Sequence, residues 1–118
     1  MQDSMAENIS AASGETKAEL VLKHASIVNV FTEEIEQGDI AINQGVIVGI
    51  GEYHGEIETE MEGRIVCPGF IDGHIHLESS MVSPAEFERI VLPHGTTTVI
   101  TDPHEIANVA GAVGIDYM

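Results

Sequence analysis

Two histidines one residue apart are the residues in this sequence best suited to bind a metal ion. His74 and His76 lie in the segment GFIDGHIHLESS, at the end of an apolar run and before a polar turn. On a β-strand, residues i and i+2 project from the same face, with Cα atoms roughly 6.5–7 Å apart. Two imidazoles so placed can each offer a nitrogen, at about 2.0–2.1 Å, to one zinc or similar ion. We therefore predict that His74 and His76 are metal ligands.

This pair supplies only part of a catalytic site. Such a site usually has three or more protein ligands and an open position for water, so other ligands must come from elsewhere. A pair of histidines at a strand end is a weak signal when taken alone. Its position strengthens the prediction, because ligands in parallel β/α folds bind at the carboxyl ends of strands.

The surrounding residues predict alternating strands and helices. An apolar strand over residues 64–76 precedes a helical stretch from Pro84, and a second strand over 96–101 precedes a helical stretch from Pro103. Strands that alternate with helices pair in parallel through crossover connections. Two βα units are therefore expected, with the histidine pair at the carboxyl end of the first strand.

Both helical stretches begin with a capping pattern. Ser83, Pro84 and Glu86 fit the N-cap, N1 and N3 positions of a capping box. Asp102 and Glu105 have the same spacing at the start of the second helix. A cap and its reciprocal partner would explain these two acids structurally, and this role competes with a role in the site.

The amino-terminal part has a different character. Residues 1–18 are polar and show no sustained period, which predicts a flexible leader. Residues 19–66 carry short β-type segments and are expected to form a small β domain. Within it, Asn43-Gln44-Gly45 separates two apolar runs, and Gly45 can take the positive φ that a tight hairpin demands.

Composition excludes several classes of function. The 118 residues carry 20 acidic and 4 basic side chains, a net charge of −16, which repels nucleic acid and anionic lipid. No apolar run approaches the roughly 20 residues that span a bilayer, and no secretory signal is evident, so a cytoplasmic protein without a membrane partner is expected. Cys67, the only cysteine, is expected to be a small buried hydrophobe and excludes a cysteine-rich zinc site.

Two segments resemble a known family. CPGFIDGHIHLESSMVSPAEF, followed by VLPHGTTTVITDPHEIANVAG, resembles the start of the barrel in the amidohydrolase superfamily. Within that superfamily, LESS at residues 77–80 and TDPHEIAN at 101–108 resemble the adenine deaminase family more selectively. The resemblance covers roughly residues 19–118.

The resemblance implies both a fold class and a reaction. The fold would be α/β: a small β domain followed by a TIM-like barrel, of which residues 67–118 would supply the first two βα units. The family converts adenine and water to hypoxanthine and ammonia in purine salvage, with a two-metal centre of manganese or iron that activates water. His74 and His76 match its first-strand ligand pair. Adenine would be the small-molecule partner, and the complete enzyme a homo-oligomer.

Four further residues are candidates to bind substrate or to hold a metal ligand in place: Glu78, Asp102, His104 and Glu105. His104 follows the second strand and would lie in the mouth of the site. Glu78 follows the histidine pair, and its alternative is a solvated loop acid.

Part of the expected site is absent from these residues. The family's remaining ligands and its proton-transferring acid come from later strands, and two strands cannot close a barrel. We therefore expect an inactive fragment of a longer enzyme, a truncated product, or one piece of an assembly. Two alternatives remain open: an amidohydrolase that acts on a cyclic amide such as dihydroorotate or a hydantoin, and a non-catalytic remnant or interaction module.

Overall fold

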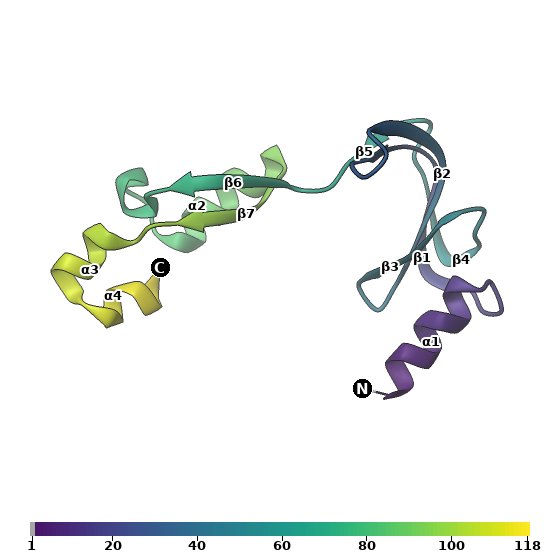
Figure 1. The fold of residues 1–118 in the computed structure, drawn as a ribbon, viewed down its shortest axis with the longest axis horizontal. Coiled ribbons are helices and arrows are strands. Elements are labelled where there is room, and N and C mark those ends of the chain that lie inside the picture. Colours follow the sequence, from purple (N-terminus) through teal and green to yellow (C-terminus); the bar gives the residue numbers. More distant parts are fainter. Residues whose placement is uncertain (1) are drawn as a thin grey trace. The chain divides into compact units, whose positions relative to one another are not determined.

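The computed structural model describes residues 2–118, with side chains from residue 4 onward. The chain divides into two compact units, Met1–Cys67 and Pro68–Met118 (Figure 1). This boundary lies one residue beyond the expected end of the β domain. Among the described residues, no helix is both long and apolar enough to span a bilayer.

The first unit is a five-stranded sheet with one helix. Its elements are α1 (Gln2–Ala12), β1 (Ala18–Asn29), β2 (Glu34–Asn43), β3 (Val46–Gly51), β4 (Gly55–Glu60) and β5 (Ile65–Val66). The main path of the sheet runs β3-β2-β1-β4, and β5 also pairs with β1. β2 is antiparallel to both β1 and β3, whereas β4 and β5 run parallel to β1.

The predicted hairpin is confirmed between β2 and β3. Asn43 pairs with Val46, and the two residues between them, Gln44 and Gly45, have φ values of +50° and +73°. Two consecutive positive φ values are what a two-residue hairpin turn requires to follow the twist of its strands. Gly45 takes this conformation without a steric penalty.

The structure differs from the leader expected over residues 1–18. Most of that segment is helix α1, and strand β1 begins at Ala18. Ala11 is buried in the core, and the Tyr53 hydroxyl donates to the Ala12 carbonyl at 3.0 Å. Ala11 is buried, whereas the larger apolar side chains Met5 and Ile9 are exposed, so the sequence of the helix lacks the apolar face that would have predicted it.

The buried carboxylate of Asp39 joins three parts of the first sheet. It accepts hydrogen bonds from the Lys23 ammonium and from the backbone amides of His24, at 3.0 Å, and Tyr53, at 3.2 Å. Burial by itself raises the pKa of Asp39, but these hydrogen bonds outweigh it and lower the pKa to about 2. Asp39 thereby fixes a bulge in β1, where His24 has a φ of +53°.

The second unit contains the two expected βα units. Its elements are β6 (Phe70–Ile75), the 3₁₀ helix η1 (Leu77–Ser80), α2 (Pro84–Val91), the 3₁₀ helix η2 (Leu92–His94), β7 (Thr96–Thr101), α3 (His104–Ala110) and α4 (Ala112–Tyr117). β6 and β7 are parallel, with Ile71 opposite Thr98 and Ile75 opposite Thr101. α2 connects them and lies beside their sheet (Figure 1). The chain is therefore mixed α/β, with parallel pairing as predicted.

The strand expected over residues 64–76 is two strands instead of one. β5 belongs to the first sheet and β6 to the second. Between them, Pro68 has no backbone N–H to donate to a strand ladder, so pairing is interrupted there. Cys67 in this connection is exposed, and the expectation that it is buried was wrong.

One of the two predicted helix caps is confirmed. Ser83 is the N-cap of α2, and its side chain accepts from the Glu86 amide at 3.4 Å. The prediction that Asp102 caps the second helix was wrong. α3 begins at His104, and its N-cap is Pro103, whose side chain makes no capping hydrogen bond.

Candidate metal centre

His74 and His76 face each other across a short gap at the end of β6. His76 has φ and ψ of −96° and 97°, so the extended backbone continues past the strand and both side chains project from one face. Their Nε2 atoms are 3.1 Å apart. Two nitrogens bound to one metal at 2.0–2.1 Å would lie about 2.9 Å apart at a right angle and about 3.3 Å apart in a tetrahedron. The observed separation lies between these values and fits one shared ion.

The tautomer of His76 leaves its Nε2 free to bind metal. Its other nitrogen, Nδ1, is 3.1 Å from the carbonyl oxygen of Asp102. A carbonyl only accepts hydrogen bonds, so Nδ1 carries the proton and Nε2 carries the lone pair. The backbone amide of His74 donates to the Asp72 carboxylate at 3.1 Å, which fixes the strand end.

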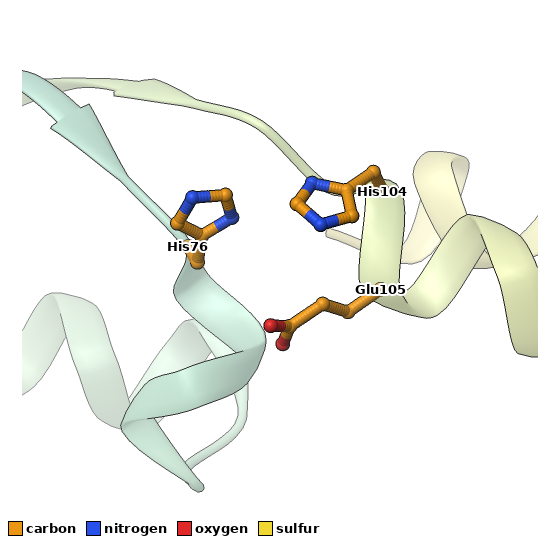
Figure 2. Close-up of side chains that lie close together, drawn as sticks. All are labelled: His76, His104 and Glu105. Carbon is orange, nitrogen blue, oxygen red and sulfur yellow. The ribbon is translucent and has the colours of Figure 1, made fainter.

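A second grouping brings His76 together with residues from the next βα unit. Potential ligand atoms of His76, His104 and Glu105 all lie within 4.8 Å of one another. Figure 2 shows His104 and Glu105 on the first turn of α3, both directed toward His76. The two imidazole rings meet edge to face, with centroids 4.8 Å apart. Two histidines and one glutamate form a ligand set known from catalytic zinc sites.

Neighbouring side chains orient both α3 residues. The Asp102 carboxylate is 3.2 Å from Nδ1 of His104, and the Ser79 hydroxyl donates to the Glu105 carboxylate at 3.2 Å. A carboxylate behind an imidazole holds the proton on the near nitrogen and turns the far nitrogen toward a ligand. The acceptor atoms of His104 and Glu105 are therefore both available on the side that faces His76.

Glu78 lies between the two βα units and is half-buried, unlike a solvated loop acid. Its Oε1 accepts from the backbone amide of Ile106 at 3.0 Å. Its Oε2 is buried and has no hydrogen-bond partner among the described residues. The Ile106 amide and then the backbone amide of Glu78 itself lower the pKa of Glu78, and together with nearby His76 and His104 they outweigh burial, which raises it.

The structure thus brings the predicted candidates into one region. His74 lies against His76, whereas His104 and Glu105 approach His76 from α3. Asp102 contributes its carbonyl to one imidazole and its carboxylate to the other. Sequence reasoning missed Ser79, although it lies within the LESS segment on which the family resemblance depended.

Comparison with known proteins shows which family this region resembles. Residues 65–118 match the amidohydrolase family. Over 118 residues the chain is 61% identical to an adenine deaminase of Geobacillus kaustophilus, covering 100% of this chain and 20% of that protein. Over 117 residues it is 52% identical to an adenine deaminase of Bacillus subtilis, again covering 20% of the relative. The resemblance predicted from the sequence is confirmed for this part of the relatives' length.

A solved structure shows the same fold. The L-hydantoinase (dihydropyrimidinase) from Arthrobacter aurescens matches with a TM-score of 0.56 and 21% sequence identity. The match covers 73% of this chain and 21% of the hydantoinase. At this level of identity the likeness concerns the fold alone.

Proposed function

We propose that the polypeptide carrying this sequence, which matches the amidohydrolase family, deaminates adenine to hypoxanthine and ammonia in purine salvage. The observation that carries the proposal is the whole-chain identity of 52–61% to adenine deaminases. The chain spans 20% of the length of these relatives. In this proposal residues 67–118 supply the first two βα units of a TIM-like barrel, and the cluster around His76 supplies part of its active site.

The donor atoms fit a centre of two divalent ions, which we propose to be manganese or iron. His74 and His76 would hold one ion between their Nε2 atoms, and His104 with Glu105 would reach the second position. Imidazole and carboxylate together suit these metals better than they suit calcium. When bound, such ions lower the pKa of a water molecule and so supply the nucleophile for attack on the amino-bearing carbon.

The first turn of α3 carries a hydrogen-bond acceptor for the amino group that adenine loses as ammonia. Adenine presents its exocyclic amino group as a hydrogen-bond donor. The Glu105 carboxylate has two oxygens, so one can reach the second ion while the other accepts from the amino group. Asp102 holds the proton of His104 on Nδ1, which leaves the lone pair of its Nε2 for the ion. Orienting the amino group before it departs as ammonia is the role in substrate binding that we assign to Glu105.

We propose that the 118 residues alone do not turn over adenine. His74, His104 and Glu105 are exposed in the structure. Water around an open site weakens every electrostatic interaction with the reacting atoms. Catalysis needs a closed site whose polar groups are already in place. In the complete enzyme, which we propose to be a cytoplasmic homo-oligomer, further chain would enclose this cluster.

Turnover of adenine by the complete polypeptide tests the proposal. The protein is purified from its source, stripped of metal with a chelator and supplied with Mn²⁺. Hypoxanthine is measured by chromatography and ammonia by a coupled assay. We expect activity that requires the metal, is lost in His76→Ala and is retained in His94→Ala, which changes an exposed histidine outside the cluster.

Two outcomes would contradict the deaminase proposal. One is opening of a cyclic amide such as dihydroorotate or a hydantoin without release of ammonia, which would favour the cyclic-amide alternative. The other is a metal-loaded polypeptide that leaves adenine unchanged, which would favour a non-catalytic role.

A further inference from the structure

We infer that Glu78 is a positioning residue that holds His104 and Glu105 opposite His76 by capping helix α3. The inference deepens the proposed function and rests on it for the role of those three side chains. Glu78 follows His76 by two residues, and its Oε1 accepts from the Ile106 amide, 28 residues further along the chain, at 3.0 Å. One side chain thereby links η1, after the first strand, to α3, after the second.

Helix α3 needs an acceptor from another segment. The first backbone amides of a helix have no partner within it, and a side chain at the N-cap normally supplies one. Here the N-cap is Pro103, which has no side-chain oxygen, and the carboxylate of Asp102 pairs with His104 instead. Glu78 provides the missing acceptor. Because His104 and Glu105 immediately precede Ile106 in the same turn, fixing the Ile106 amide fixes the backbone that carries both.

The burial of Glu78 supports a fixed side chain. Its second carboxylate oxygen, Oε2, is buried without a hydrogen-bond partner among the described residues. A solvated acid would turn both oxygens toward water, since leaving one buried and unpaired costs free energy. Glu78 instead keeps the position from which Oε1 reaches α3.

The residue after Glu78 makes a parallel link. Ser79 donates from its hydroxyl to the Glu105 carboxylate at 3.2 Å. Consecutive residues of η1 therefore bind consecutive residues of α3: Glu78 holds the backbone at Ile106, and Ser79 orients the side chain at Glu105. These two hydrogen bonds connect the segment that follows His74 and His76 to the helix that carries His104 and Glu105.

The test compares three variants of the 118-residue chain. Glu78→Ala removes the acceptor, whereas Glu78→Gln keeps an oxygen that can accept from the Ile106 amide. Ser83→Ala is the matched control, because it removes the N-cap of α2, a neighbouring helix that carries none of the cluster residues. Hydrogen exchange of the Ile106 amide is measured by NMR without metal, and Mn²⁺ affinity by titration calorimetry.

We expect Glu78→Ala to expose the Ile106 amide to exchange and to weaken Mn²⁺ binding on the order of tenfold or more, as residues behind metal ligands do. Glu78→Gln should preserve both properties. Ser83→Ala should lower thermal stability but leave Mn²⁺ affinity unchanged. In a His104→Ala background, Glu78→Ala should weaken binding much less, because the side chain that it positions is already gone.

Three results would overturn the inference. An unchanged Ile106 exchange rate in Glu78→Ala would show that the cap is not formed. An equal loss of Mn²⁺ affinity in Glu78→Gln and Glu78→Ala would show that Glu78 acts through its charge and not by positioning α3. Equal weakening by Ser83→Ala would indicate general destabilisation. If the unmodified chain binds no Mn²⁺, the proposed metal centre fails, and the exchange measurement alone still decides whether Glu78 caps α3.

Discussion

At the scale of single residues, His76 is the centre of the candidate site. It belongs both to the pair with His74 and to the group with His104 and Glu105. One of its nitrogens lies 3.1 Å from His74, and its ring meets that of His104 at a centroid distance of 4.8 Å. Its remaining nitrogen is held by the Asp102 carbonyl at 3.1 Å. Loss of this side chain would therefore remove a ligand, an orienting contact and one of the contacts between the segments that follow β6 and β7.

Metal affinity should depend on His76 more than on the other histidines. We expect His76→Ala to weaken Mn²⁺ binding more than either His74→Ala or His104→Ala does, and by more than the roughly 10- to 100-fold typical of residues behind the ligands. His94→Ala should have no effect. Titration calorimetry with each variant measures the order, and equal losses in His76→Ala and His94→Ala would contradict a site built on His76.

At the scale of elements, the hairpin between β2 and β3 depends on a left-handed backbone at both turn residues, of which Gly45 is the one that adopts it without a steric penalty. Gly45 has a φ of +73°, and an added Cβ there would meet no atom within 4 Å. Any cost of replacing it is therefore conformational and not a matter of space. The positive φ at this position serves the turn and not the packing of side chains.

Replacing Gly45 should destabilise the first unit. We expect Gly45→Ala to lower the free energy of unfolding by about 1 kcal/mol, the cost of a left-handed backbone for an L-residue. Gly38→Ala is the control, since its Cβ would meet its nearest atom at an ordinary 3.5 Å without a positive φ. Urea denaturation compares the two, and equal destabilisation would contradict the conformational explanation.

The Asp39 contacts predict a pH dependence of stability in the same unit. The pKa of Asp39 is lowered from 3.8 to about 2 in the folded chain, so the folded state favours the ionised carboxylate. Its contribution, about 2 kcal/mol, is fully present above pH ~4 and is lost as the pH falls through about 2. Asp39→Asn should remove this dependence and lower stability at neutral pH. Denaturation series from about pH 5 to about pH 2 compare the two proteins, and parallel curves would contradict a role for Asp39.

At the scale of the whole molecule, the charge is strongly unbalanced. With 20 acidic and 4 basic side chains, the net charge of −16 makes a compact chain repel itself. Exposed charges of one sign are screened by salt, and buried pairs such as Lys23 with Asp39 are screened less. Repulsion among the surface acids should therefore dominate the response of this protein to ionic strength.

Salt should stabilise the folded chain at neutral pH. Raising the salt concentration from about 0.01 M to about 0.15 M shortens the screening length from about 30 Å to about 8 Å, which weakens the repulsion. We expect the thermal midpoint to rise. Near the isoelectric point of about 4.4 the net charge vanishes and the effect should disappear. A rise of the same size at both pH values would show that the salt acts by another route.

Local patterns in the sequence determined several parts of this structure. Ser83, Pro84 and Glu86 marked the start of α2, and Gly45 marked the hairpin turn, because caps and tight turns depend on residues only a few positions apart. The alternation of strands and helices predicted the parallel pairing of β6 and β7. The spacing of His74 and His76 placed both imidazoles on one face, since a strand repeats every two residues.

Only the tertiary structure decided how the separate segments meet. Asp102 had the spacing of a helix cap, but it binds His104 with its carboxylate and His76 with its carbonyl, while Glu78 caps α3 from 28 residues away. Helix α1 likewise gains its place by packing small residues such as Ala11 on the first sheet. Such contacts depend on which distant groups the fold brings within hydrogen-bonding or packing distance, and no spacing along the chain encodes that distance.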